Sequence, residues 1–153
     1  MLTMQWHGDA WDVITNCKPK LADFSLTGRL DSQVFQIAKP ITGTLKIEKC
    51  KAKVASIDVQ LVRNEEVKID GTAANDLTEV QSIQLVDGDI GPDLEIPIFV
   101  ILPRLYTCPS LTTKDFSINF ELNIVVAFQD EQRITKTEQS EMAAIKFPIR
   151  LMR

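Results

Sequence analysis

A short stretch near the carboxyl end of the chain alternates strictly between apolar and polar side chains. From Phe116 to Ile124 the even-numbered residues are large and apolar, and the residues between them are Ser, Asn, Glu and Asn. Successive side chains of a β-strand point to opposite faces of the sheet, so this pattern gathers every large apolar group on one face. It predicts a strand with one buried and one solvated face.

The same alternation recurs along the chain at the spacing typical of a β-sandwich. Further strands are predicted at Phe24–Gly28, Thr44–Glu48, Ile57–Leu61, Val80–Leu85, Leu94–Leu102 and Ile145–Leu151. Pro97 favours an edge or a bulged position for its strand over a central one, because proline cannot donate to a neighbouring strand. Turns are predicted at Pro40–Gly43, Asp70-Gly71, Asp87–Asp89, Gly91–Asp93 and Pro103–Pro109. No stretch between strands carries the period of a crossover helix, so the fold class is all-β, a sandwich of about seven antiparallel strands.

Two stretches lack a clear period. The first twenty residues include Trp6, His7 and Trp11. These aromatics are expected to pack on the sandwich or on a neighbouring domain, in preference to forming a ligand site. The stretch Glu131–Lys146 has helical propensity but could equally continue a strand. It is interpreted as a long hairpin or an insertion before the last strand.

Charge and composition exclude some classes of partner. The net charge of −4 argues against nucleic acid and against a polybasic membrane surface, because both need clustered Lys and Arg. The densest basic run is Lys46, Lys49, Lys51 and Lys53. Alternating lysines on a strand are typical of a solvated face or of an edge guarded against aggregation.

The cysteines and the apolar runs predict the compartment. Cys17, Cys50 and Cys108 are odd in number and far apart, which favours free thiols in a reducing compartment. No apolar run is long enough to span a bilayer, and the amino terminus lacks the pattern of a secretory signal. We expect a soluble, cytosolic protein.

The side-chain constellations that enzymes need are missing from the sequence. His7 is the single histidine, which disfavours a Ser-His-Asp or Cys-His arrangement, and no close Cys or His pair suits zinc. Asp87, Asp89 and Asp93 do not match the calcium-binding EF-hand pattern, so an acidic hairpin turn is favoured. Paired carboxylates for glycoside chemistry stay open, because their separation depends on the fold. The sequence predicts no enzyme, no catalytic residue, no metal and no cofactor.

Four ordered segments carry a family resemblance. They are Phe24–Leu30, Ile57–Arg63, Thr78–Asp89 and Pro103–Pro109. The chain resembles the carboxyl-terminal half of the arrestin-like subunits of the retromer and retriever complexes, over residues 18 to 130 and again at Phe147–Met152. The segment Pro103–Pro109, followed by Asp115-Phe116 and the alternating strand, favours the retriever form.

The resemblance implies an immunoglobulin-like, arrestin-like β-sandwich. Residues 1–20 would be a leader or inter-domain connection, and residues 21–153 the carboxyl-terminal sandwich domain. The chain departs from the family pattern in the Asn64–Asn75 loop and in Glu131–Lys146, which looks longer than the last hairpin of the family.

The resemblance also implies a function and a site. Such a subunit is a non-enzymatic scaffold, cytoplasmic and peripheral on endosomes, that docks an α-solenoid subunit. Sorting-nexin adaptors and cargo tails are further expected partners. The interface residues implied are Leu85, Val86, Asp87 and Gly88, interpreted as a hairpin tip. Leu85 could equally end an inward row with Ile83, whereas Val86, expected on the opposite face, favours the interface.

Other functions remain open on sequence alone. An arrestin-like sandwich can bind peptides by adding a ligand strand to an open edge. A hydrolase or a lectin can be built on the same fold, since fold alone does not fix function. A secreted adhesion module is disfavoured by the odd cysteine count.

Overall fold

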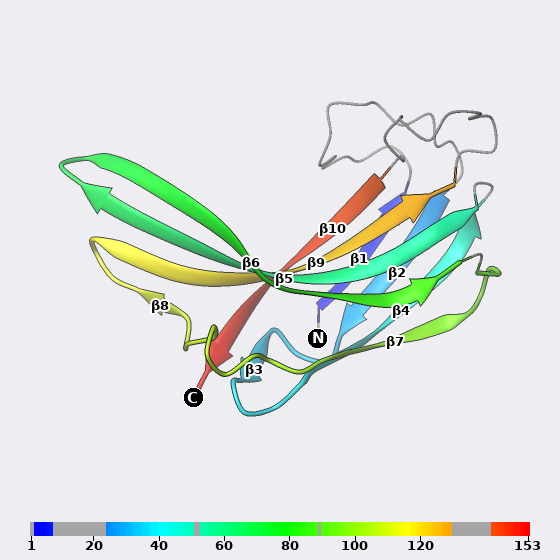
Figure 1. Ribbon diagram of the computed structural model, residues 1–153, viewed down its shortest axis with the longest axis horizontal. Helices are drawn as coiled ribbons and strands as arrows, with labels where there is room; N and C mark the ends of the chain where they lie inside the picture. Colours follow the sequence, from blue (N-terminus) through cyan, green and yellow to red (C-terminus); the bar gives the residue numbers. More distant parts are fainter. Residues whose placement is uncertain (1, 8–23, 51–52, 89, 130–141) are drawn as a thin grey trace.

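Ten strands form two stacked sheets in the computed structural model, which describes residues 2–7, 24–50, 53–88, 90–129 and 142–153 (Figure 1). Their bounds are β1 (Leu2–His7), β2 (Phe24–Leu30), β3 (Val34–Gln36), β4 (Ile41–Cys50), β5 (Val54–Ile69), β6 (Thr72–Asp87), β7 (Glu95–Val100), β8 (Leu111–Thr112), β9 (Phe116–Phe128) and β10 (Met142–Met152). All seven predicted strands are confirmed, and β1, β3 and β8 were not anticipated.

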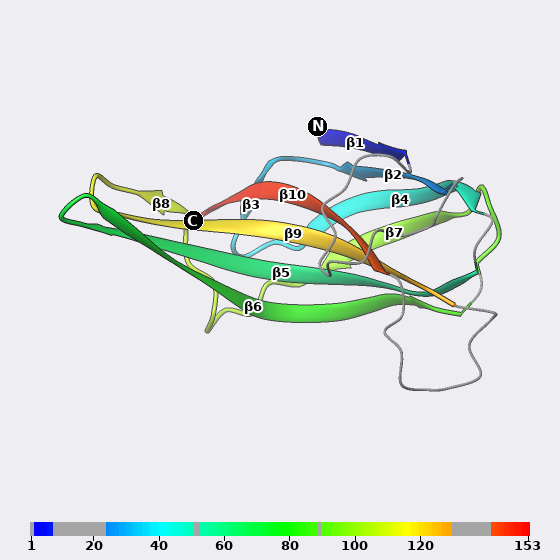
Figure 2. The same cartoon turned by 90° about the horizontal axis from the view of Figure 1, so that it is seen from above.

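One sheet has the strand order β1-β2-β4-β7 and the other the order β3-β10-β9-β5-β6, with β8 added beside β9. Figure 2 shows the two layers from above. The strand pairs are antiparallel except for β3 with β10. The edge position predicted from Pro97 is confirmed, because β7 is the outermost strand of its sheet.

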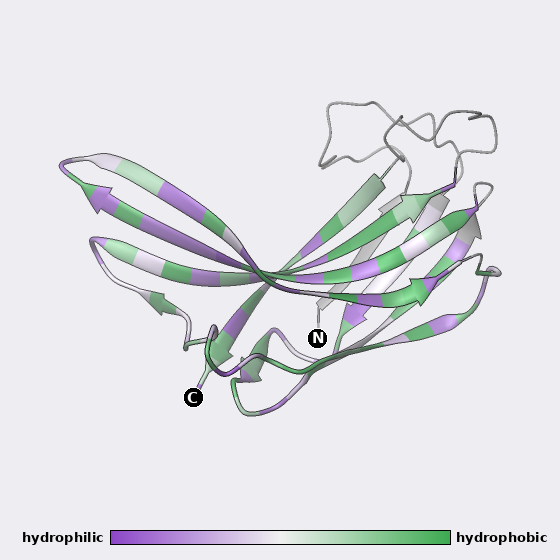
Figure 3. Cartoon of the chain, in the orientation of Figure 1, coloured by the Kyte–Doolittle hydropathy of each residue, from purple (hydrophilic) through white to green (hydrophobic). Residues whose placement is uncertain are grey.

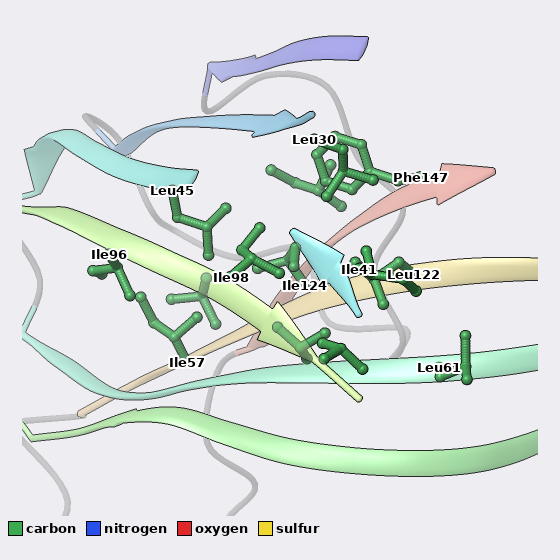
Figure 4. Packing of buried hydrophobic residues seen from close by; sticks show 14 of the residues in the cluster. Leu30, Ile41, Leu45, Ile57, Leu61, Ile96, Ile98, Leu122, Ile124 and Phe147 are labelled. Carbon is green, nitrogen blue, oxygen red and sulfur yellow. The ribbon is translucent and has the colours of Figure 1, made fainter. Parts of the chain in front are cut away.

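The core lies between the sheets, where the alternating strands meet face to face (Figure 4). Phe120, Leu122 and Ile124 point into it from β9 and are almost fully buried. Phe147 of β10 reaches across to β2, where a Cβ added at Gly28 would lie 2.7 Å from its ring. The layers are therefore packed at the close density of protein interiors, which leaves no room for a larger residue at Gly28.

Gly43 is not in a turn, as the sequence suggested, but inside β4 opposite Leu30. A Cβ at this position would lie 2.3 Å from the carbonyl oxygen of Arg29. The glycine allows two backbones to approach closely in the middle of a sheet. The turn prediction failed because glycine marks both turns and close backbone contacts.

The longest element is the β5–β6 hairpin, which closes at Asp70-Gly71 as predicted. Both residues have positive φ, 48° and 81°, and this pair favours the two-residue turn whose twist matches paired strands. The Asn64–Asn75 segment, interpreted as a loop from the sequence, is this strand–turn–strand unit. These strands were not predicted because charged and small residues interrupt the alternation of apolar and polar side chains.

The outer part of this hairpin extends beyond the four-stranded sheet together with β8 and the start of β9 (Figures 1 and 2). We call residues 62–79 and 111–121 the wing. Its strands continue the pairing of the sandwich, with Val67 opposite Phe116 and Ala74. At its inner end Phe120 still faces the core and Ile118 packs against it, and beyond these residues the wing is a single sheet layer.

The amino-terminal stretch contributes a strand. Leu2–His7, within the predicted leader, pairs with Leu30–Ser25 of β2, so part of that leader belongs to the sheet. Trp11, Cys17 and most of the Glu131–Lys146 segment lie outside the described residues, and the division of the chain at residue 20 stays a prediction. At the end of that segment, β10 begins with Met142 and runs through the predicted last strand.

Candidate protein-interaction surface

The four predicted interface residues lie at the end of β6, the outermost strand of the six-stranded sheet. They do not form a hairpin tip. After Gly88 the chain crosses to the other sheet and enters β7, which pairs with β4 and not with β6. The hairpin interpretation was wrong because an Asp-Gly pair signals a turn without saying which strands it joins.

A β-bulge sets the direction of Leu85 and Val86. Val86 pairs with Ile57 while Gln84 pairs with Asp58, so Leu85 is the extra residue on the β6 side. Because the bulge interrupts the alternation, Ile83 and Val86 both face the core side, although they are three residues apart. The expectation that Val86 lies on the opposite face is therefore wrong.

Both apolar side chains are half-buried and contact the core. Leu85 therefore contacts the core, as expected for a residue that ends the inward row, and its role in an interface stays a prediction. Side chains anchored in this way are held in position while still offering apolar surface, which is the property of residues that dominate protein interfaces. The pair can act as a rigid contact point for another protein.

Gly88 ends the strand through its backbone conformation. Its φ is +99°, and its N–H donates to the carbonyl oxygen of Ala55 at 2.8 Å. A Cβ on Gly88 would meet nothing within 4 Å. Glycine is therefore favoured here because of the positive φ and not because of a steric clash. Asp87, opposite Ser56, is exposed beside the apolar pair.

The crossing from β6 to β7 is fixed by contacts to β4. Asp93, with φ +67°, donates its N–H to the carbonyl oxygen of Ile47 at 2.8 Å, and its carboxylate lies 3.2 Å from the ammonium of Lys46. Ile90 packs against the core. The Asp93 contacts hold the segment before β7 against β4.

Within the described part of the chain, no three His, Cys, Asp or Glu side chains come together as a metal site. Asp87 and Asp93 belong to that part, whereas Asp89 does not. Cys108 is a free thiol, half-buried against the core.

Other exposed apolar side chains were missed from the sequence. Phe99 and Ile101 point outward at β7, and Leu105 and Tyr106 stand on a turn held by two backbone hydrogen bonds to Pro103. Val67, Ile69, Leu111 and Phe116 are exposed on the wing. The signal was present for Val67 and Ile69, which alternate with Lys68 before an Asp-Gly turn. Among the described residues, no helix is long and apolar enough to cross a membrane.

Comparison with known proteins gives consistent results. The model of the family "Vps26: Vacuolar protein sorting-associated protein 26" matches residues 29–131, more than half of the chain. The curated protein "Vacuolar protein sorting-associated protein 26C" of Dictyostelium discoideum is 35% identical over 136 residues, which cover 89% of this chain and 42% of that protein. The chain thus spans less than half the length of this relative.

A solved structure resembles the fold at low sequence identity. The crystal structure of Spo0M, a sporulation control protein from Bacillus subtilis, matches with a TM-score of 0.63 and 13% identity over 87% of this chain and 51% of that one. This likeness concerns the all-β, arrestin-like sandwich alone. With the family match over residues 29–131 and the 35% identical relative, the chain is a member of the Vps26 (vacuolar protein sorting-associated protein 26) family.

Proposed function

We propose that this chain is a non-enzymatic scaffold of endosomal cargo retrieval, of the retriever type, that docks an α-solenoid subunit through the end of β6. Family membership supports the sorting role. Leu85 and Val86 form the apolar centre of the proposed contact, and Asp87 and Gly88 form its rim. The observation that carries the proposal is the half-burial of an apolar pair at a bulged sheet edge.

The physical case rests on preorganisation. Interface hot spots are well-packed side chains that become fully desolvated on binding and are surrounded by contacts that exclude water. The bulge and the Gly88–Ala55 hydrogen bond restrain this end of β6 before any partner arrives. A rigid contact loses less conformational entropy on binding than a mobile loop.

Membrane recruitment would then be indirect. Sorting-nexin adaptors and cargo tails are the partners expected to bring the complex to the membrane, since the net charge of −4 gives this chain no attraction to anionic lipids. The proposed location is the cytoplasmic face of endosomes, as a peripheral subunit.

The test replaces each apolar residue with a small polar one. Leu85→Ser and Val86→Ser should each weaken binding of the purified solenoid subunit at least tenfold by isothermal titration calorimetry, because the loss of a hot spot costs about 2 kcal/mol or more. Each change should also lower stability by about 1–2 kcal/mol, because these side chains touch the core.

A matched control separates lost contact from lost stability. Val80 is half-buried on the same strand and packs on the same core, away from the proposed contact. Val80→Ser should destabilise the chain by a similar amount and leave the affinity unchanged. Equal affinity of all three variants and the parent would remove the end of β6 from the interface.

A second candidate function is peptide binding by strand addition along β6. One observation favours it: β6 is sixteen residues long and ends the strand order of its sheet. An extended cargo tail could pair with this edge. Chemical-shift changes along Thr72–Glu79 on adding a cargo-tail peptide, without the solenoid, would support this function, and their absence would exclude it.

A further inference from the structure

The wing has two faces of different character. One face continues the core side of the sheet. On this face Val67 of β5 lies opposite Phe116 of β9, and Glu65 lies opposite Ile118. Ile118 also pairs with Leu111 of β8. Ile69 follows Val67 on the same face, since it is two residues further along the strand. The opposite face presents residues such as Asn64, Glu66 and Lys68. We call the first face the inner wing face.

The inner wing face exposes apolar surface that the sandwich would bury. Val67 is 42% exposed and Ile69 65%, whereas Val59 and Leu61 earlier on the same strand are buried. Leu111 and Phe116 are also exposed. The four-stranded sheet covers the corresponding residues of the sandwich but ends before the wing (Figures 1 and 2). Figure 3 shows hydrophobic bands continuing into the wing along β5 and β9.

The net negative charge of the chain resides in the wing. Residues 62–79 and 111–121 contain three Lys and Arg (Arg63, Lys68 and Lys114) and seven Asp and Glu (Glu65, Glu66, Asp70, Asp76, Glu79, Asp115 and Glu121), a balance of −4. The whole chain has 17 basic and 21 acidic residues, so the remainder is neutral. Of these, Glu65 and Asp76 lie on the inner wing face and Asp70 lies in the turn at its tip, while Arg63 on the same face is 3.0 Å from Glu65. This local excess of acidic groups beside the apolar strip favours a partner with apolar residues flanked by basic ones.

The dimensions of the strip indicate the form of that partner. Its apolar residues lie across β5, β9 and β8, three neighbouring strands that together span about 10 Å. This is about the diameter of one α-helix with its side chains. A sheet face is covered by a helix or by a second sheet, and one helix suits a strip of this width.

We propose that the inner wing face binds a basic amphipathic helix of a partner protein. The helix buries an apolar stripe on Val67, Ile69, Phe116 and Leu111, and its Lys and Arg lie toward Asp70 and Asp76. This site is separate from the proposed solenoid contact, because it uses the opposite end of the β5–β6 hairpin.

The test uses two synthetic peptides as probes. Both have Leu at the i, i+3, i+4, i+7 positions of an amphipathic helix, and the remaining positions are Lys in one peptide and Glu in the other. The whole chain should bind the Lys peptide and not the Glu peptide in isothermal titration calorimetry. Added salt should weaken the binding, because screening acts on exposed charges.

Two pairs of variants separate apolar contact from charge. The double variant Val67→Thr with Ile69→Thr keeps every charge and the β-branched shape, and should weaken binding at least tenfold. The double variant Asp70→Asn with Asp76→Asn keeps the shapes and removes two charges, and should weaken binding several-fold and reduce its salt dependence. Asn tolerates the positive φ of Asp70 and can still accept from the Thr78 hydroxyl as Asp76 does.

Matched controls lie outside the wing. Phe99→Thr with Ile101→Thr removes two side chains of similar exposure, 56% and 67%, one near the end of β7 and one just after it. Asp31→Asn with Glu95→Gln removes two charges elsewhere. Both controls should bind the Lys peptide like the parent chain.

Three results would overturn the proposal. The first is equal binding of both peptides, and the second is equal loss of affinity in the wing variants and in their controls. The third is a concentration-dependent dimer that the Val67→Thr with Ile69→Thr variant abolishes, because the occupant of the face would then be a second copy of the chain. Solenoid binding should be unaffected by the wing variants, so failure here leaves the proposed function untouched.

Discussion

The two ends of the β5–β6 hairpin share one backbone pattern and differ in what lies above them. In the sandwich, Ile57, Val59 and Leu61 are covered by the second sheet and are buried. In the wing, Val67 and Ile69 continue the same alternation on the same face and are exposed. The difference teaches that strand pairing alone buries little side-chain surface, and that a second layer is needed to make a core.

The two ends of the β5–β6 hairpin also differ in the kind of partner contact that they offer. The sandwich end of β6 holds an apolar pair half-buried at a bulge, where a rigid contact can form. The wing end offers a wider apolar strip within an acidic surround. We infer that the first end is a fixed docking point and the second a charged platform for another segment.

The largest effect is expected in the sandwich core. Phe147→Ala should lower the free energy of unfolding by about 3–5 kcal/mol, since it empties a fully buried site that also packs on Gly28. Urea unfolding followed by circular dichroism measures this loss. A loss below about 1 kcal/mol would mean that the two layers are not closely packed there.

A smaller loss is expected where two strands approach closely. Gly43→Ala should cost about 1–3 kcal/mol, because the new Cβ would overlap the carbonyl oxygen of Arg29 and force β2 and β4 apart. The same urea experiment checks it. An unchanged urea midpoint would show that β2 and β4 can move apart here at little cost in free energy.

The turn of the wing should respond locally. Gly71→Ala places a Cβ on a residue with φ +81°, at a cost of about 1–2 kcal/mol. Because the wing lacks a second layer, we expect faster amide exchange in Glu66–Asn75 and little change in the melting temperature. A melting temperature lowered as much as by Gly43→Ala would show that wing and sandwich unfold together.

The smallest effect is expected on the inner wing face. Ile69→Ala removes a side chain that is 65% exposed and should change the free energy of unfolding by no more than about 0.5 kcal/mol. Ile57→Ala, on the same strand and face but fully buried, should cost about 2–5 kcal/mol. Similar losses for the two variants would contradict the contrast between the regions.

Alternation predicted the strands that have a covered face and failed for those that do not. Phe116–Ile124 and Ile57–Leu61 alternate because one face meets the other sheet. Asn64–Asn75 has no such constraint, so its polar and small residues resembled a loop. The pairing of β1 with β2 is a long-range contact that the composition of Leu2–His7 does not reveal.

The residues of the candidate site were identified from the family resemblance, but their geometry could not be predicted from the sequence. Leu85 and Val86 were identified from the residues before an Asp-Gly pair, but their shared direction depends on a bulge opposite Ile57. A bulge shifts the alternation by one residue, and nothing in the local sequence marks the shift. The exposed strip of the wing depends on where the second sheet ends, which is a property of the whole fold.

Hydrogen exchange with and without the solenoid subunit tests the central claim most directly. Amides of Ile83–Ile90 should gain protection on binding, and those of the wing, Arg63–Thr78, should exchange at the rate of the free chain. Protection in the wing with none at Ile83–Ile90 would contradict the assignment of the docking point to the end of β6.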